Sequence, residues 1–287
     1  MKIIAIFFTL LLNSLCLYGN DFAIEDVEFT SHSVQLSGSI VFPLNEEIHS
    51  AVVFVHGSGE QTRSLYWAKK FAEAGIVTLV YDKRGVGKSG GKYEGNQSVS
   101  EKNINLLADD AIAALKFLRT YSRTKELPLG LTGISQAGWI VPLAAQKSQL
   151  ADYIVIWSGP VCKVSEEDIY SKYTRDLDGE RVPSYKEALE ARKVKYVWPD
   201  FLGKDSNPSN NLANLNIPGL WIFGEKDGSV PVDLSIKRLN KLIDKGRDYE
   251  YVLFSKLGHN NMNETFATAT NWIKRLKINQ DLNFDQQ

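Results

Sequence analysis

Six short apolar runs, most of them separated by helical segments, limit this chain to a small set of folds. The runs are AVVFVH (51–56), GIVTLVYD (75–82), LPLGLTGI (127–134), DYIVIWSG (152–159), IPGLWIFG (217–224) and YEYVLFS (249–255). A strand that is apolar at every position is typical of a parallel sheet with both faces covered. Residues between the runs repeat apolar side chains at helical spacing; these helical segments include 64–75, 100–121, 232–246 and 263–277. The alternation predicts an α/β fold with a doubly wound, mostly parallel sheet and right-handed crossovers.

The chain before the first apolar run has a different pattern. Residues 26–31 and 34–43 alternate apolar and polar side chains. Such alternation is typical of strands with one face in the core and one face in solvent. We therefore expect a half-exposed antiparallel hairpin at the N-terminal side of the sheet.

One long interval lacks an apolar run. Between Pro160 and Asn216 the sequence instead has charged helical stretches, at 166–180 and 184–203. Long excursions in compact domains are often functional, so we expect a helical lid inserted at about 160–215. The alternative is a solvated helical hairpin with no role in substrate binding.

Residues 1–19 have the layout of a secretory signal peptide, with a lysine, an apolar stretch and then small and polar residues. The apolar stretch, residues 3–12, is shorter than the roughly 20 residues that span a bilayer. We expect its removal to leave residues 20–287 as one domain, secreted or periplasmic and without stable membrane insertion. An uncleaved N-terminal anchor is the alternative.

Composition and charge give no support for nucleic-acid binding or for an internal disulfide. The 287 residues are 44% hydrophobic, enough for a full core, and the formal net charge of −1 gives no basic surface for nucleic acid. There are two cysteines, Cys16 and Cys162. Because Cys16 leaves with the signal peptide, no internal disulfide is expected in the mature chain, and Cys162 is expected to be a buried or pocket-lining thiol.

Chemically useful residues follow three of the apolar runs. Ser135 follows the third run, Asp227 the fifth and His259 the sixth. The carboxyl ends of parallel strands share one edge of an open α/β sheet, where such folds place their sites. Taken singly, Ser135 could cap a helix, Asp227 could cap the helix after Pro231, and His259 could lie in a surface loop.

Five motifs carry a resemblance to a known family: HGSG (56–59), DKRGVGKSG (82–90), GISQAG (133–138), FGEKD (223–227) and LGHNN (257–261). Together they resemble bacterial serine esterases of the α/β-hydrolase superfamily, near the dienelactone-hydrolase and acyl-CoA-thioesterase-like groups. GISQAG departs from the family's G-x-S-x-G turn because Ala137 replaces the last glycine. Alanine is tolerable there if the turn needs a small side chain and not a positive φ.

The resemblance implies an α/β-hydrolase fold and a role for each of the three residues. The family order is Ser, then Asp or Glu, then His. Ser135 would attack the acyl carbon, His259 would carry the proton, and Asp227 would orient His259. Glu225, two residues before Asp227, is the rival acid, but the family pattern G-x-x-D favours Asp227.

The resemblance also implies where the oxyanion is held. The family uses a backbone N–H beyond its His-Gly turn together with the N–H that follows the nucleophile. In this sequence these are Ser58 and Gln136, with Gly59 as the alternative to Ser58. His56 is expected to brace the turn.

The glycine-rich segment 82–90 has neither of the usual phosphate-binding patterns. We expect a tight loop in which Asp82 and Arg84 brace the rim of the site.

The predicted function is therefore a secreted serine carboxylesterase that hydrolyses small acyl esters through an acyl-enzyme, with no cofactor and no metal. A serine peptidase or thioesterase with the same triad is the alternative, as is a non-catalytic binding protein of the same fold. A peptidase would need an acidic handle for the substrate amine, such as Glu166, Glu167 or Asp168. The sequence gives no prediction of oligomeric state.

Trp198 and Phe201 lie in the expected lid among charged residues. Helices that cap a pocket bury aromatic side chains over the acyl group. We therefore expect Trp198 or Phe201 to line the acyl pocket. The alternative is that both pack the lid onto the domain.

Overall fold

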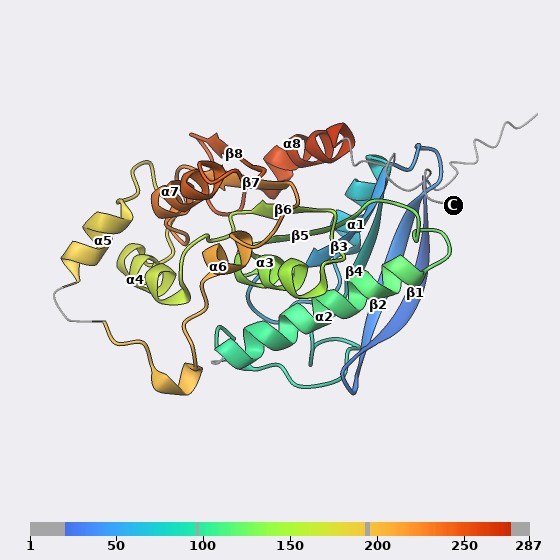
Figure 1. Cartoon of the computed structure of the whole chain (residues 1–287), viewed down its shortest axis with the longest axis horizontal. Helices are drawn as coiled ribbons and strands as arrows, with labels where there is room; N and C mark the ends of the chain where they lie inside the picture. Colours follow the sequence, from blue (N-terminus) through green and yellow to red (C-terminus); the bar gives the residue numbers. More distant parts are fainter. Residues whose placement is uncertain (1–20, 96–97, 193–195, 277–287) are drawn as a thin grey trace, which may run out of the picture.

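A computed structural model describes residues 21–95, 98–192 and 196–276 of the chain. Within these ranges, eight strands form one sheet in the order β1-β2-β4-β3-β5-β6-β7-β8, with helices on both faces (Figure 1). Neighbouring strands from β4 to β8 are parallel, whereas β1 pairs with β2 and β2 with β4 in antiparallel orientation. The predicted α/β fold, with a mostly parallel sheet and an N-terminal antiparallel hairpin, is confirmed. The predicted signal peptide, residues 1–19, lies outside the described residues.

The six apolar runs form the parallel strands, with boundaries within two residues of those expected. The strands are β3 (Ser50–Val55), β4 (Ile76–Tyr81), β5 (Leu129–Ile134), β6 (Tyr153–Trp157), β7 (Gly219–Gly224) and β8 (Tyr249–Phe254). All but β8 are buried along nearly their whole length. β8 is partly exposed because it is the last strand of the sheet.

The N-terminal hairpin consists of β1 (Phe22–Ser31) and β2 (Val34–Pro43). β1 alternates as expected, but β2 is buried at nearly every position, so its predicted half-exposure is wrong. β2 lies between β1 and β4, and helices cover both faces of the sheet at this strand. As a result Val41 belongs to the core on one face of the sheet, and Ile40 and Phe42 belong to the core on the other.

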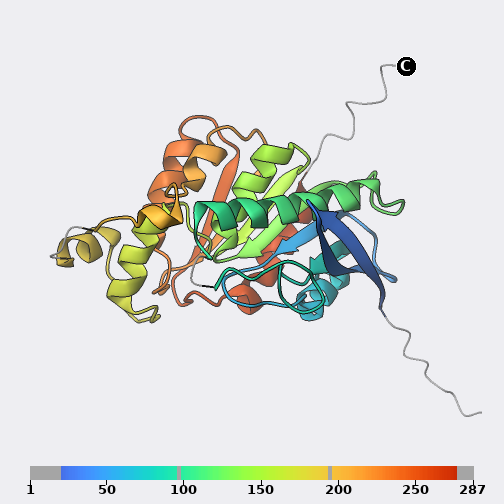
Figure 2. The same ribbon diagram turned by 90° about the horizontal axis from the view of Figure 1, so that it is seen from below.

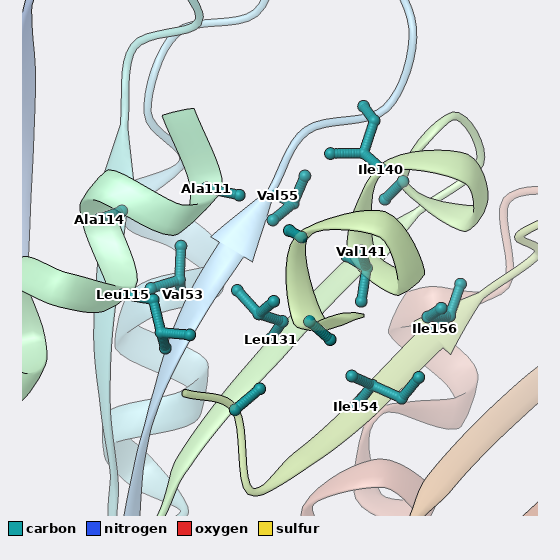
Figure 3. Close-up of a cluster of buried hydrophobic side chains, with 14 of the residues drawn as sticks. Val53, Val55, Ala111, Ala114, Leu115, Leu131, Ile140, Val141, Ile154 and Ile156 are labelled. Atoms are coloured by element: carbon teal, nitrogen blue, oxygen red, sulfur yellow. The ribbon is translucent and has the colours of Figure 1, made fainter. Parts of the chain in front are cut away.

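Helices on the two faces of the sheet close two hydrophobic cores. α2 (Glu101–Thr120), α3 (Ala137–Ser148) and α7 (Val232–Ile243) cover one face, and α1 (Leu65–Glu73) and α8 (Met262–Arg275) cover the other (Figure 2). Figure 3 shows the first core, where Val53, Leu131 and Ile154 of the strands meet Leu115 and Val141 of the helices. Each large apolar side chain buried in this way contributes about 1.5–3 kcal/mol. The packed cores fix the strand ends that carry the site.

The insertion between β6 and β7 is helical, as predicted. It contains α4 (Val164–Thr174), α5 (Tyr185–Ala191), the 3-10 turn η2 (Asp200–Leu202) and α6 (Pro208–Leu212). In Figure 1, α4 and α5 lie at the opposite end of the molecule from the β1–β2 hairpin.

The expected long helical stretch at 184–203 is wrong in its extent. The helix ends at Ala191, and Val197 and Trp198 are not helical. Pro199 follows them, and a proline disfavours helical geometry in the residue before it. Residues 193–195 lie outside the described part of the chain.

Candidate active site

Ser135 occupies a tight turn between the end of β5 and the start of α3. Its φ is 56°, in the left-handed region that residues other than glycine rarely adopt. Its N–H donates to the carbonyl of Trp157 (3.0 Å), and its carbonyl accepts from the Gly138 N–H (2.8 Å). A strained, half-buried serine held by both strand and helix is the arrangement expected of a nucleophile turn.

The substitution of Ala137 for the family's glycine has a steric explanation. Ala137 is the first residue of α3 and has no positive φ. A Cβ on Gly133 would lie 2.5 Å from the Ala137 Cβ, and a Cβ on Gly138 would lie 2.6 Å from the ring of Pro160. The turn therefore needs glycine at 133 and 138 and a small side chain at 137.

Asp227 and His259 meet at the carboxyl ends of β7 and β8. The distance from His259 Nδ1 to Asp227 Oδ2 is 2.8 Å. Asp227 is fully buried, and its other oxygen accepts from the N–H groups of Ser229 (2.8 Å) and Val230 (2.9 Å). Glu225, the rival acid, is exposed. The structure thus brings Asp227 and not Glu225 to the histidine.

The charges around His259 favour its protonated form. Burial by itself lowers the pKa of His259, but the hydrogen bond and charge of Asp227, followed by the charges of Asp178 and Glu167, outweigh it and raise the pKa above 6.5. When the ring is neutral, the contact with Asp227 holds the proton on Nδ1 and leaves Nε2 free to act as a base.

Both the serine turn and the histidine loop are attached to the end of β6. Trp157 accepts from the Ser135 N–H, and the hydroxyl of the next residue, Ser158, donates to the carbonyl of His259 (2.7 Å). Asn261 in turn donates to the Ser158 hydroxyl (2.9 Å). The structure describes the side chains of Ser135 and His259, and they form no hydrogen bond to each other. Such catalytic hydrogen bonds often tighten only when substrate binds.

The two expected oxyanion donors have unengaged backbone N–H groups. Neither Ser58 N–H nor Gln136 N–H has an acceptor among the described residues. Ser58 is exposed, whereas Gln136 is buried and its side-chain amide donates to the carbonyl of Ser98 (2.9 Å). His56 is also buried, and its Nε2 contacts the carbonyl of Tyr81 (2.5 Å), which is consistent with a bracing role.

Lys83 is a residue of this site that the sequence interpretation missed. It is 1% exposed, and its ammonium donates to the carbonyls of Gly57 (2.8 Å) and Gly59 (3.1 Å) and to Gln136 Oε1 (2.9 Å). The available signal was its position two residues after the buried strand β4, between Asp82 and Arg84, which were already expected to be structural.

The expected bracing by Asp82 and Arg84 takes the form of two ion pairs. Asp82 pairs with Arg63 (3.0 Å) and also accepts from the N–H of Lys88 (2.9 Å). Arg84 forms a two-pronged pair with the fully buried Asp110 of α2. These pairs hold the glycine-rich loop against the hairpin and α2.

The insertion directly contacts the loops that carry Asp227 and His259. Asp178, after α4, accepts from the N–H of His259 (2.9 Å) and from the N–H of Gly228 (2.9 Å). Tyr170 donates its hydroxyl to the carbonyl of Asp227 (3.1 Å). A Cβ on Gly258 would lie 2.0 Å from the Asp178 carboxylate, so the contact requires glycine there. Sequence reasoning did not identify any of these contacts.

Of the three lid acids considered as an amine handle, two have cationic partners. Glu166 pairs with Arg238 and Asp168 with Lys172. Burial raises the pKa of Glu167 to about 8, and the neighbouring acids add to the effect, whereas His259 opposes it. Of these three acids, Glu167 is therefore the one whose charge interacts with that of His259.

The apolar side chains expected near the acyl group differ in exposure. Trp198 packs against the cluster of Ile104, Trp139 and Val164, and its ring N–H donates to the carbonyl of Gly203 (2.7 Å). Phe201 is 70% exposed and does not line an enclosed pocket in this structure. Cys162 is buried, and burial raises the pKa of its thiol, which makes it an unreactive group.

No helix within residues 21–95, 98–192 and 196–276 has the length and apolar character needed to cross a membrane. No group of three or more His, Cys, Asp and Glu side chains in the same ranges has an arrangement that would hold a metal ion.

Known proteins similar to this chain are named as esterases and peptidases. Esterase EstD of Thermotoga maritima is 29% identical over 218 residues, which cover 68% of this chain and 50% of that protein. An esterase of Pyrococcus furiosus has a TM-score of 0.62 at 21% identity, covering 88% of this chain and 89% of the other. The acylaminoacyl peptidase of Pyrococcus horikoshii has a TM-score of 0.66 at 20% identity, covering 92% and 43%.

The two solved structures support the fold, and a family model supports the family. The chain spans about half the length of the curated relatives it matches. The model described as "Serine aminopeptidase, S33" matches residues 46–209, more than half of the chain. The chain belongs to this family of serine hydrolases with the α/β-hydrolase fold.

Proposed function

We propose that the protein is a serine carboxylesterase that hydrolyses small acyl esters through an acyl-enzyme. The observation that carries the proposal is the pair of His259 and buried Asp227, 2.8 Å apart, beside a serine turn anchored to the same strand end. The similarity to Esterase EstD supports ester hydrolysis over other reactions of the family.

The first half of the reaction forms the acyl-enzyme. His259 Nε2 accepts the Ser135 hydroxyl proton while Ser135 Oγ attacks the ester carbonyl carbon. The N–H groups of Ser58 and Gln136 donate to the resulting oxyanion. The imidazolium, stabilised by Asp227, then gives its proton to the leaving alcohol as the ester C–O bond breaks.

The second half regenerates the enzyme. Water enters in place of the alcohol and loses a proton to His259 as its oxygen attacks the acyl carbon. Collapse of the second oxyanion breaks the bond to Ser135 Oγ, which takes the proton back, and releases the carboxylic acid. No residue is changed over the cycle.

Replacement of the nucleophile tests this function. We expect Ser135→Ala to lower kcat for p-nitrophenyl butyrate by several orders of magnitude, because the family's chemistry passes through this hydroxyl. Thermal unfolding should stay close to that of the wild type. Ser122→Ala, in an exposed loop after α2, is the matched control and should hydrolyse normally. Near-normal hydrolysis by Ser135→Ala would contradict the proposal.

One observation favours a second candidate, a peptidase for substrates with a free amine. The charge of Glu167 helps to raise the pKa of His259, and His259 in turn opposes the raised pKa of Glu167. A substrate ammonium beside Glu167 would stabilise the negatively charged form of the Glu167 carboxylate, which burial disfavours. Aminoacyl p-nitroanilides distinguish the two functions: a peptidase should cleave them with a KM that rises in Glu167→Gln, whereas an esterase should leave them uncleaved.

We further propose that the mature chain is exported. The support is the layout of residues 1–19, which has a lysine and a short apolar stretch. Mass spectrometry of the protein from the periplasm or medium of the expressing bacterium should find an N-terminus within residues 17–20. A protein that starts at Met1 and stays in the cytoplasm would contradict export.

A further inference from the structure

Lys83 carries a buried positive charge, and it forms no ion pair with an acid in the part of the chain that the structure describes. Its three N–H donors have three acceptors, the carbonyls of Gly57 and Gly59 and the side-chain oxygen of Gln136. Its sequence neighbour Asp82 pairs with Arg63 instead. Burial lowers the pKa of Lys83 to about 8. A buried charge is costly even when hydrogen-bonded, so the position calls for an explanation beyond packing.

The acceptors of Lys83 connect the two arms of the proposed oxyanion site. Gly57 and Gly59 lie in the turn after β3, on either side of Ser58. Gln136 lies directly after Ser135, at the start of α3. A single ammonium therefore links the turn that carries one expected donor to the residue that carries the other.

The hydrogen bond from Lys83 to the Gly57 carbonyl also fixes the direction of the Ser58 N–H. The Gly57 carbonyl and the Ser58 N–H belong to one peptide unit, which is planar and trans. In such a unit the C=O and N–H bonds point in opposite directions. Because Lys83 holds the carbonyl at 2.8 Å, the Ser58 N–H has to point away from the ammonium.

The following peptide unit has a different anchor. The carbonyl of Ser58 accepts from the side-chain amide of Gln61 (2.6 Å), and this unit contains the Gly59 N–H, the alternative donor. Lys83 thus orients the Ser58 N–H and Gln61 orients the Gly59 N–H. The two candidate donors can be separated by changing their anchors.

We propose that Lys83 is a positioning residue of the oxyanion site, which holds the Gly57–Ser58 peptide so that the Ser58 N–H points at the acyl oxygen. It acts through the peptide and does not touch the reacting atoms. Its contact with Gln136 keeps this turn in register with the serine turn. The proposal rests on the proposed ester hydrolysis by Ser135.

The test compares Lys83→Met with Gln61→Met and with Lys88→Met, an exposed lysine on the same loop. Rates for p-nitrophenyl butyrate are expressed per serine titrated with a fluorophosphonate, so that misfolded protein does not count. Loss of one oxyanion donor costs about 10²–10³ in kcat. We expect Lys83→Met to lose about that much in kcat with little change in KM, and Gln61→Met and Lys88→Met to lose far less.

A transition-state analogue separates positioning from general support of the fold. A trifluoromethyl ketone binds as a tetrahedral oxyanion, so its affinity should fall in Lys83→Met by a factor similar to the loss in kcat. If Lys83→Met does not fold, Lys83→Arg replaces it; the planar guanidinium cannot reproduce three converging hydrogen bonds, and a selective loss of kcat is again expected.

The outcomes against the proposal are distinct. Unchanged kcat and analogue affinity in a folded Lys83 variant would overturn it, as would a loss of thermal stability with no selective loss of kcat. A large loss in Gln61→Met alone would identify Gly59 as the donor and also overturn it. A wild-type protein that neither hydrolyses esters nor reacts with the fluorophosphonate would instead refute the proposed function.

Discussion

At the scale of single residues, burial and orientation separate side chains that look equivalent in the sequence. Asp227 and Glu225 are two positions apart in one loop, but Asp227 is fully buried and contacts His259, whereas Glu225 faces solvent. Two backbone N–H groups hold the second oxygen of Asp227. The carboxylate therefore has one free direction, which points at the histidine.

This difference predicts opposite results for two similar substitutions. Asp227→Asn should lower kcat by about 10³–10⁴, because an amide cannot hold the proton on His259 Nδ1 in the same way. Glu225→Gln, its matched control, should change kcat very little. Steady-state kinetics on a p-nitrophenyl ester measure both, and a severe defect in the Glu225 variant beside an active Asp227 variant would reverse the assignment.

The sequence predicts which residues belong to the candidate site, but it does not predict the contacts between them. Ser135, Asp227 and His259 were located by their positions after apolar runs, and the structure brings two of them into contact. Lys83 was missed because its partner Gln136 is 53 positions away in the chain. No local pattern reports a hydrogen bond over that separation, since it depends on how β4 and β5 pack on either side of β3.

At the scale of elements, the insertion is bonded to the loops that carry Asp227 and His259. Asp178 accepts hydrogen bonds from the backbone of both loops, and Tyr170 of α4 contacts the carbonyl of Asp227. A movement of α4 would therefore change the surroundings of His259. This coupling gives the predicted lid a mechanical connection to the proposed base.

The charge of Asp178 leads to a prediction about pH. Asp178 is one of the groups that raise the pKa of His259, together with Asp227 and Glu167. Because the base must be neutral, activity increases as pH rises through the His259 pKa, which is raised from its ordinary value in the wild type. Asp178→Asn should move this acid limb to lower pH, and the weakened hydrogen bonding, worth about 1 kcal/mol, should lower kcat about five-fold.

The measurement is the pH dependence of kcat/KM for the wild type, Asp178→Asn and Asp200→Asn. Asp200 is an exposed acid of η2 in the same insertion, and its variant should keep the wild-type profile. An acid limb that stays in place in Asp178→Asn, or that moves to higher pH, would contradict the proposed coupling.

At the scale of the whole molecule, hydrophobic patterning determined most of what could be predicted. Continuous apolar runs place β3 to β7 inside the sheet because helices cover both of its faces. The alternating pattern of β2 was misleading: its polar residues Ser37 and Ser39 are buried, and both bond to Arg63. The pattern of a strand therefore identifies the strand but not what covers it.

The fold gathers the candidate site from segments distant in sequence. The turns after β3 and β5 and the loops after β7 and β8 lie at one edge of the sheet, and the end of β6 holds two of them. Asp178 of the insertion accepts hydrogen bonds from the loops that carry Asp227 and His259. Such a site is expected to activate one serine and no other.

Covalent labelling of the intact protein tests that expectation most directly. Only a serine with an activated hydroxyl reacts quickly with a fluorophosphonate. After brief labelling, digestion and mass spectrometry, the account predicts a single adduct per chain, on Ser135, and none in the His259→Ala variant. An adduct on another serine, or rapid labelling that persists without His259, would contradict it.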